Sequence, residues 1–355
     1  MFSFKPIYFV LVLIILGGCS GTSSVGKADE EADVINLQQV VATNQDVLDE
    51  RAIIQDVFHS IKSFKKFSFI TPEDYLEKAS FVYYPENDHL DYYESYSIEG
   101  VYNTIDLRSK KNFSPKKDYQ FKRDSLNNIR SIDHESLQIE IGKFKEEDFS
   151  IMLAKEGEKT LYESSYYHKD FTDNLMNQVA HSLKSEDQGV YDLYFDRILL
   201  DMDKIKLPNL NPNKIGVQSI SSSFTEVNGF SLELIYSTPD KYEFIYIIRD
   251  TEQIESQYQK KGTEILNGTE ISLYFNEYNQ GFNVFMWSDD EHFYELRNSI
   301  KTSLTDKEDI YEIIKSSMDD SRSFTDMSLF KPTNPKPVLN SEDKEIRDKI
   351  KMFSK

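Results

Sequence analysis

The sequence predicts an α+β fold in which a largely antiparallel, curved sheet, or two such sheets, packs against helices. Beyond Pro208, runs of alternating apolar and polar residues follow one another, and this alternation is typical of half-buried strands. The pair Asn228-Gly229 precedes the first of these runs and Asn267-Gly268 precedes the third, and Asn-Gly is the pair most favoured in two-residue hairpin turns. With 24 Phe and 22 Tyr among 355 residues, the chain also carries enough bulky apolar surface to bury a core.

The chain is acidic, with 41 basic against 61 acidic residues and a formal net charge of −20. A charge of this sign repels phosphate backbones and anionic lipid headgroups. Nucleic acid is therefore not an expected partner. At about 150 residues per domain, the length is sufficient for roughly two domains.

The first 18 residues have the pattern of an export signal. Lys5 supplies a positive end, and the apolar run over 7–16 is too short to cross a bilayer as a helix. The tetrad Leu16-Gly17-Gly18-Cys19 resembles the bacterial lipobox. That resemblance implies cleavage before Cys19, a diacylglycerol on its sulfur, and attachment to the extracytoplasmic face of the cell membrane. The alternative is an ordinary secretory signal that contains a cysteine by chance.

Cys19 is the only cysteine of the chain, so no second thiol is present for a disulfide or a metal site. Residues 20–33 are small, polar and finally acidic, which suits a flexible tether. We therefore expect five segments: a lipoprotein signal peptide over 1–18, a tether over 19–45, an N-terminal α/β region over 46–189, an antiparallel sheet with a helix over 190–320, and a proline-rich connector with a terminal helix over 321–355.

The N-terminal region mixes helical and strand patterns. Apolar residues recur every three or four positions over 53–64, which predicts a helix that packs on a sheet. Thr71-Pro72-Glu73-Asp74 has the hydroxyl cap, early proline and acids that predict a second helix start. Strict alternation over 137–141 predicts a strand, and helical spacing returns over 171–183.

The following region has the clearest strand pattern. The segment 190–206 is ambiguous and favours a helix. Alternating apolar runs over 230–236, 242–248 and 271–275, with a further run at 282–286, predict an antiparallel meander. Thr305-Asp306-Lys307-Glu308 is a capping box, and it predicts a helix that buries Ile310, Ile313 and Ile314.

Residues of this region also resemble a known family. The run Gly281 to Trp287, the strand Tyr294-Glu295-Leu296 and a helix ending in Ile314-Lys315-Ser316-Ser317-Met318 are similar to the carboxy-terminal half of the DUF4367 family. The resemblance covers roughly residues 200 to 320, with Met318 where leucine is usual. It implies an extracytoplasmic protein of Gram-positive bacteria, some members being linked to sporulation or sigma-factor control, without an assigned biochemical role.

Beyond residue 320, three prolines make a stiff connector, and Ser341 is expected to cap a final helix with Ile346, Ile350 and Phe353 on one face. A helix of this length is marginal alone, so it should dock onto the body of the protein or, as an alternative, onto another protein. No internal repeat is visible in the sequence.

No complete catalytic or metal-binding pattern is visible in the sequence. Ser63 to Lys66 and Ser114 to Lys117 match S-x-x-K, the start of a penicillin-binding signature, but no K-T-G follows, so both matches are interpreted as accidental. The six histidines form no pair at the spacing that places two imidazoles on one helix face. Asp201 and Asp203, or Asp289, Asp290 and Glu291, could contribute to a calcium site but lack the rest of an EF-hand, so a solvated acidic turn is the favoured interpretation. No nucleophile elbow or phosphate loop is present, and no cofactor is implied.

Aromatic side chains are the remaining candidates for a binding site. Tyr242, Phe244 and Tyr246 share one face of a predicted strand, and with Trp287 they could line an apolar groove or simply form core. Lipoprotein-carrier folds such as the LolA-like sheet use a covered curved sheet in this way. We therefore expect a non-enzymatic, membrane-anchored lipoprotein that binds a hydrophobic ligand or a polypeptide. The alternatives are a cell-envelope hydrolase that uses acidic residues and a structural assembly factor.

Overall fold

The computed structural model describes residues 40–42, 47–101, 104–145, 149–167, 172–185, 202–239, 243–276, 282–299, 307–330 and 339–353. Residues 1–34 lie outside the described residues. The predicted signal peptide, the lipobox and Cys19 therefore remain predictions. Within the described part of the chain, no helix is both long enough and apolar enough to span a membrane.

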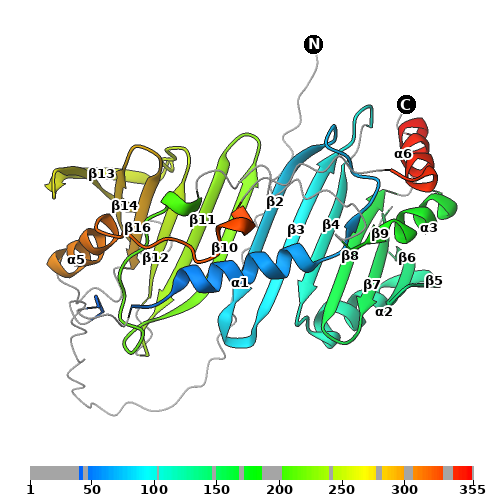
Figure 1. Cartoon of the computed structure of the whole chain (residues 1–355), viewed down its shortest axis with the longest axis horizontal. Helices are drawn as coiled ribbons and strands as arrows, with labels where there is room; N and C mark the ends of the chain where they lie inside the picture. Colours follow the sequence, from blue (N-terminus) through cyan, green and yellow to red (C-terminus); the bar gives the residue numbers. More distant parts are fainter. Residues whose placement is uncertain are drawn as a thin grey trace. The chain divides into compact units, whose positions relative to one another are not determined.

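One antiparallel sheet of fourteen strands dominates the described structure, as Figure 1 shows. Its first seven strands in sequence are β2 (Tyr75–Tyr84), β3 (His89–Ser97), β4 (Ile105–Lys111), β5 (Leu126–His134), β6 (Leu137–Phe144), β7 (Phe149–Glu156) and β8 (Thr160–Tyr167). The last seven are β10 (Gly216–Thr225), β11 (Gly229–Ser237), β12 (Glu243–Arg249), β13 (Tyr258–Leu266), β14 (Thr269–Asn276), β15 (Phe282–Ser288) and β16 (Phe293–Ser299). The sheet is open, with β5 and β13 at its two edges. The α+β prediction with an antiparallel sheet is confirmed.

The two sets of seven strands have the same topology. In sheet order they run β2-β3-β4-β8-β7-β6-β5 and β10-β11-β12-β16-β15-β14-β13, and the antiparallel pair β2–β10 joins them. Bulges also recur at equivalent places, after Leu76 in β2 and after Val217 in β10, and again in β5 and β13. The topology therefore repeats although no repeat is visible in the sequence. Alternating residues and turns can specify the same topology with different residues.

The strand order also corrects the predicted meander. The alternating runs do form β11, β12, β14 and β15, but β12 pairs with β16 instead of β13. The chain passes from β12 to the far edge and returns through β13, β14 and β15. Local alternation determines which segments become strands but not which strands become neighbours.

Helix α1 (Glu50–Ser63) confirms the first predicted helix and lies across the junction of the two halves (Figure 1). Its first residue, Glu50, accepts a hydrogen bond from Tyr236 on β11, and Phe64, which ends the helix, packs edge-on against Tyr162 on β8. Between them, Phe58 contacts Phe81 on the junction strand β2, with ring centroids 5.8 Å apart. One helix therefore packs on strands from both halves.

The other long helices are α3 (Asp173–His181), α5 (Lys307–Met318) and α6 (Ser341–Phe353). Their buried side chains belong to the same core as α1 and one face of the sheet. In α5, Ile310, Ile313 and Ile314 are buried as predicted, whereas Thr305 and Asp306 of the capping box lie outside the described residues. A short two-stranded sheet pairs β1 (Lys66–Phe67) with β9 (Leu183–Lys184).

The terminal helix α6 docks onto the first half, against α3. Ile346 and Ile350 are buried, but Phe353 is 40% exposed, so it is not part of the buried face. The cap is Asn340, not Ser341, because the Asn340 side chain accepts a hydrogen bond from the backbone N–H of Asp343. Docking onto the body of the protein is therefore confirmed.

The predicted helix start at Thr71-Pro72-Glu73-Asp74 is wrong, because a turn there leads directly into β2. The Asp74 carboxylate bonds back to the Thr71 N–H and hydroxyl and receives Arg347 from α6. This buried bonding closes the turn, and the aromatic and β-branched residues that follow favour a strand.

Candidate functional site

The predicted aromatic groove is part of the packed core where the structure describes it. Phe244, Tyr246 and Trp287 are 1%, 0% and 6% exposed, and Tyr242 lies outside the described residues. The Trp287 ring stacks on Tyr294 at 5.6 Å, and the Tyr246 hydroxyl donates to the Lys206 carbonyl at 3.0 Å. These side chains are buried in contacts within the protein, so they do not line an open groove.

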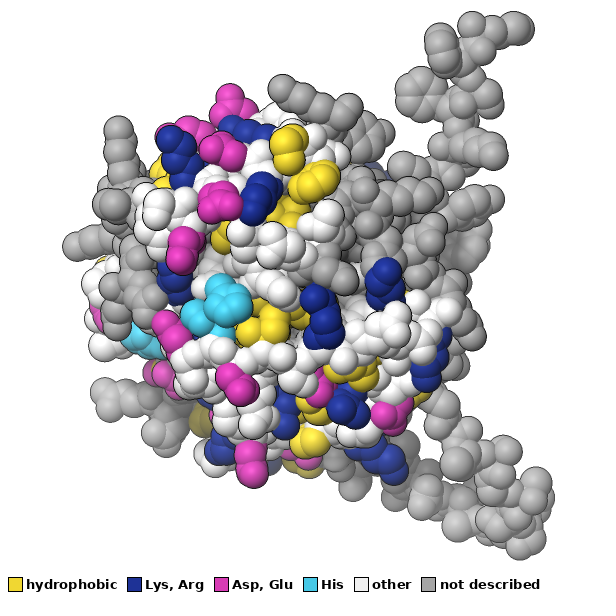
Figure 2. All heavy atoms as spheres, turned by 90° about the vertical axis from the view of Figure 1, so that its right-hand side faces the viewer, with side chains coloured by type: hydrophobic (Ala, Val, Ile, Leu, Met, Phe, Trp, Pro, Cys, Tyr) yellow, Lys and Arg dark blue, Asp and Glu magenta, His cyan; other side chains and the backbone are white. Residues whose placement is uncertain are grey.

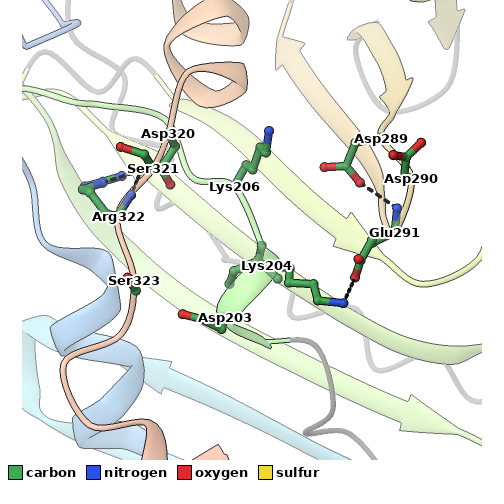
Figure 3. A pocket seen from close by; sticks show the side chains of 11 residues that line it. Asp203, Lys204, Lys206, Asp289, Asp290, Glu291, Asp320, Ser321, Arg322 and Ser323 are labelled. Carbon is green, nitrogen blue, oxygen red and sulfur yellow. Dashed lines mark hydrogen bonds and ion pairs between the residues drawn. The ribbon is translucent and has the colours of Figure 1, made fainter.

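A polar cavity of about 440 Å³ lies beside this aromatic cluster. Three segments far apart in sequence surround it: the 3₁₀ turn Met202–Lys204 with the two residues after it, the hairpin turn between β15 and β16, and the segment that follows α5. Its lining is Asp203, Lys204, Ile205, Lys206, Asp289, Asp290, Glu291, Asp320, Ser321, Arg322 and Ser323. Figure 3 shows the Glu291 side chain directed toward Lys204 across the cavity.

The two acidic stretches singled out in the sequence meet at this cavity. Asp203 and Asp289 to Glu291 both line it, whereas Asp201 lies outside the described residues. An ion pair of 2.5 Å between Lys204 and Glu291 joins the two stretches. Across the described residues, no group of three or more His, Cys, Asp or Glu side chains could hold a metal ion. At the cavity, the described residues of the two stretches and Lys204 form a surface that carries both signs of charge.

Asp289 shapes the hairpin turn. Its carboxylate accepts hydrogen bonds from the backbone N–H groups of Glu291 and His292, at 3.0 and 2.8 Å, and from the Tyr294 hydroxyl at 3.0 Å. Burial alone raises the pKa of Asp289, but these donors outweigh burial and hold the pKa below its ordinary value. Asp289 therefore stays ionised and fixes the turn that presents Asp290 and Glu291.

Asp320 and Arg322 fix the third segment. Arg322 donates to the Asp320 carboxylate at 2.7 Å and to the backbone carbonyls of Leu48 and Leu207. Asp320 also receives Arg51 of α1 at 2.8 Å. Burial opposes ionisation of Asp320, but Arg322 and the other donors keep its pKa below the ordinary value. This wall of the cavity is therefore tied to α1 and to the segment before β10.

Glu50 lies behind this wall, next to Arg322, and its pKa is raised. Burial raises the pKa of Glu50 to about 7, although Arg322 at 3.6 Å and the Tyr236 hydroxyl at 3.0 Å favour the ionised form. One of its carboxylate oxygens, Oε2, has no hydrogen-bond partner. Glu50 is therefore protonated in the folded chain at a pH at which an unfolded chain has released the proton.

Stability should therefore fall as the pH rises from about 4.5 to 7, because the unfolded chain ionises Glu50 first. Replacing Glu50 with Gln removes this dependence. From pH 4.5 to pH 7.5, the free energy of unfolding of Glu50→Gln should gain about 3 kcal/mol relative to wild type, at about 1.4 kcal/mol per pH unit. Urea unfolding at several pH values measures the difference. Parallel curves for the two proteins would show that Glu50 titrates normally.

Two histidines that are far apart in the sequence also lie close together. His134 at the end of β5 and His181 at the end of α3 have ring centroids 5.0 Å apart, and the His181 Nδ1 lies 2.7 Å from the Asn177 carbonyl. Figure 2, which faces this side of the molecule, shows histidine side chains together at the surface. Burial, followed by the neighbouring His181, lowers the pKa of His134. Spacing along the chain could not reveal this pair, because the packing of α3 on β5 creates it.

The cavity has the chemistry of a binding site. Its two hydroxyls, Ser321 and Ser323, have no histidine beside them in the cavity lining, so a serine-histidine arrangement is not formed there. The sequence patterns missed the basic and serine side chains of the cavity, since single lysines, arginines and serines outside a motif give no local signal. The described cations are already engaged: Lys206 donates to the Met318 carbonyl, and Arg322 is bonded as above.

Comparisons with known proteins give no family. No family model and no curated protein matches the chain. Among solved structures, a chain in the complex structure of Pseudomonas aeruginosa MucA/MucB is similar at 7% identity, over 72% of this chain and 96% of that chain, with a TM-score of 0.16. No inference about fold or function is drawn from a similarity of this size.

Proposed function

We propose that the chain is a non-enzymatic, extracytoplasmic lipoprotein that is anchored through Cys19 and binds a polar segment of a polypeptide partner in the cavity beside α5. The observation that carries this proposal is the contrast between a filled aromatic core and an open cavity lined by both signs of charge. Leu16, Gly17 and Gly18 would supply the lipobox. The resemblance to DUF4367 expected for residues 200 to 320 would imply the same location, although no family model matches the chain.

The cavity suits an extended polypeptide. Its walls hold acidic, basic and hydroxyl groups within about 440 Å³. The basic groups already have partners within the chain, so Asp203, Asp290 and the hydroxyls of Ser321 and Ser323 are the groups that would bond a partner's cations and main-chain amides. Several of these side chains are fixed by hydrogen bonds inside the protein, as Asp289, Asp320 and Arg322 are. A preformed site loses little conformational entropy when a partner binds.

An apolar ligand is the less favoured occupant. A carrier-type groove needs a curved sheet and a covering helix that leaves the aromatic side chains accessible. We propose that the sheet is curved but that its aromatic side chains are not accessible to a ligand. Tyr246 is fully buried, and Trp287 is stacked on Tyr294, so a ligand would have to displace existing contacts.

A hydrolase that uses acidic residues is the second candidate, since acids from distant segments converge at the cavity. Glycoside hydrolysis needs one carboxyl with a raised pKa as general acid. Bonded donors lower the pKa of Asp289 and Asp320 despite their burial, and Glu291 is paired with Lys204. Neither Asp289 nor Asp320 therefore has the raised pKa that a general acid needs.

Native mass spectrometry of the full chain, extracted from membranes in mild detergent, tests the proposal. We expect a mature chain that begins at a diacylated Cys19 and carries a co-purified polypeptide. Lys204→Glu should remove the polypeptide, because it reverses the charge that faces Glu291. Lys344→Glu is the matched control, since Lys344 is exposed on α6, far from the cavity lining. A bound lipid that survives Lys204→Glu would instead support the apolar-ligand alternative.

A further inference from the structure

The chain contains one strongly basic segment despite its acidic total. Residues 108–130 hold eight Lys or Arg and two Asp, a formal charge of +6, whereas the whole chain carries −20. The segment includes the end of β4, a π-helical turn over Pro115–Gln120 and the short helix α2 (Phe121–Asp124). The positive charge of this segment is therefore opposite to the charge expected from the composition of the whole chain.

The structure fixes this segment against the sheet face opposite the main core. Tyr119 packs on the small cluster formed by Leu126, Ile151 and Leu153. The Tyr119 hydroxyl donates to Glu140 on β6 at 2.7 Å, and Arg123 donates to the same carboxylate at 2.9 Å. Lys122 pairs with Glu163 on β8. The side chains on the inner side therefore attach the segment to β6 and β8, and this attachment orients the side chains on its outer side.

The outer side of this segment combines an aromatic ring with positive charge. Phe121 is 70% exposed, the largest exposed fraction of an aromatic side chain in the described residues. Lys116 and Lys117, one turn earlier, are exposed, and no ion pair is found for either within the described residues. Lys145 is exposed too and reaches the Asp124 carbonyl at 2.6 Å.

We propose that this outer side, formed by Lys116, Lys117, Phe121 and Lys145, docks onto an anionic phospholipid bilayer. Lysines near a negatively charged leaflet are attracted to it, and an aromatic ring is favoured at the boundary between headgroups and acyl chains. The rest of the chain is acidic and is repelled by the same surface. Opposite charges on one molecule therefore orient it, with α2 toward the membrane.

The proposal is independent of the cavity and of lipid modification, because it rests on the exposed side of α2 alone. If the protein is anchored through Cys19, this basic side meets the bilayer at high effective concentration. A weak affinity of the basic side for the bilayer would then be enough to orient the protein on the membrane. Each near-surface lysine should contribute about fivefold to membrane partition, which corresponds to about 1 kcal/mol.

A fluorescent label on the outer side tests the proposal. Cys19→Ser removes the only native thiol and any acyl chain, and Gln120→Cys then places a single environment-sensitive label beside Phe121 in the full chain. Asn213→Cys, at an exposed site before β10, is the control position. In vesicles of phosphatidylglycerol and phosphatidylcholine we expect spin-labelled lipids to quench the label at 120 but not at 213. Phosphatidylcholine vesicles or 1 M salt should abolish quenching.

Charge-reversal variants provide the second readout. The double variant Lys116→Glu with Lys117→Glu should raise the lipid concentration needed for half-maximal quenching at position 120 at least 25-fold. Phe121→Ala should make the label at position 120 sit less deeply in the bilayer. Lys260→Glu with Lys261→Glu is the matched control, because these neighbouring lysines are exposed on the edge strand β13. Equal quenching at 120 and 213, equal effects of the two lysine pairs, or salt-independent binding would each overturn the proposal.

Discussion

Replacing Arg347 with alanine is expected to lower the free energy of unfolding by about 3–5 kcal/mol, the usual cost of removing one partner of a buried ion pair. Arg347 of α6 donates to both oxygens of Asp74, each at 2.8 Å, and the two side chains are 9% and 0% exposed. Burial raises the pKa of Asp74, while Thr71 and Arg347 oppose that rise. Without Arg347 the carboxylate stays buried with no cation near it.

The effect should appear in urea unfolding and in faster proteolysis of the end of the chain, because the pair holds α6 to the turn before β2. Lys349→Ala is the matched control on the same helix. It breaks a pair with Glu345 at 2.7 Å, whose side chains are 28% and 58% exposed, and a hydrogen bond to Gln178 of α3 at 3.2 Å. Because both contacts are partly exposed, the variant should cost at most about 1 kcal/mol. Equal costs for the two variants would show that α6 is held by its apolar side chains alone.

Phe58→Ala is expected to cost about 3–5 kcal/mol, since it deletes a fully buried ring. Phe58 packs edge-on against Phe81 at 5.8 Å and against Phe330 at 5.5 Å. The first contact reaches the strand that joins the two halves of the sheet, and the second reaches the 3₁₀ turn Met327–Phe330. The loss should therefore weaken the coupling of the two halves as well as overall stability.

Urea unfolding followed by two probes measures that coupling. Wild type should unfold in one transition, whereas Phe58→Ala should show a lower slope or separate transitions. Asp56→Ala, an exposed position on α1, should change the midpoint little. A small loss in Phe58→Ala with one sharp transition would mean that the β2–β10 pairing alone couples the halves.

Elements were predictable where one face of a segment is buried. Alternation identified β6, β11, β12 and β14, and helical spacing identified α1, α3 and α5, because each pattern records a single buried face. The turn at Asn267-Gly268 also matched, with both residues at positive φ. At the other pair only Gly229 has positive φ, and the Asp250 carboxylate packs against it.

The remaining features depend on partners that lie far away in sequence. Asp74 closes a turn instead of starting a helix, since Arg347 arrives from the other end of the chain. Tyr246 of β12 became core because Trp287 and Tyr294 on nearby strands pack against its ring. The cavity needs the 202–206, 289–291 and 320–323 segments at one place, and only the strand order brings them together.

Site-specific photo-crosslinking in living cells tests the central claim most directly. A benzoylphenylalanine at Ser323, which is exposed in the cavity wall, should capture a distinct polypeptide, and Lys204→Glu in the same chain should abolish the adduct. The same photo-reactive residue at Gln138, exposed on β6, should not capture that polypeptide. An adduct that forms equally at both positions, or that persists with Lys204→Glu, would contradict a polypeptide-binding cavity.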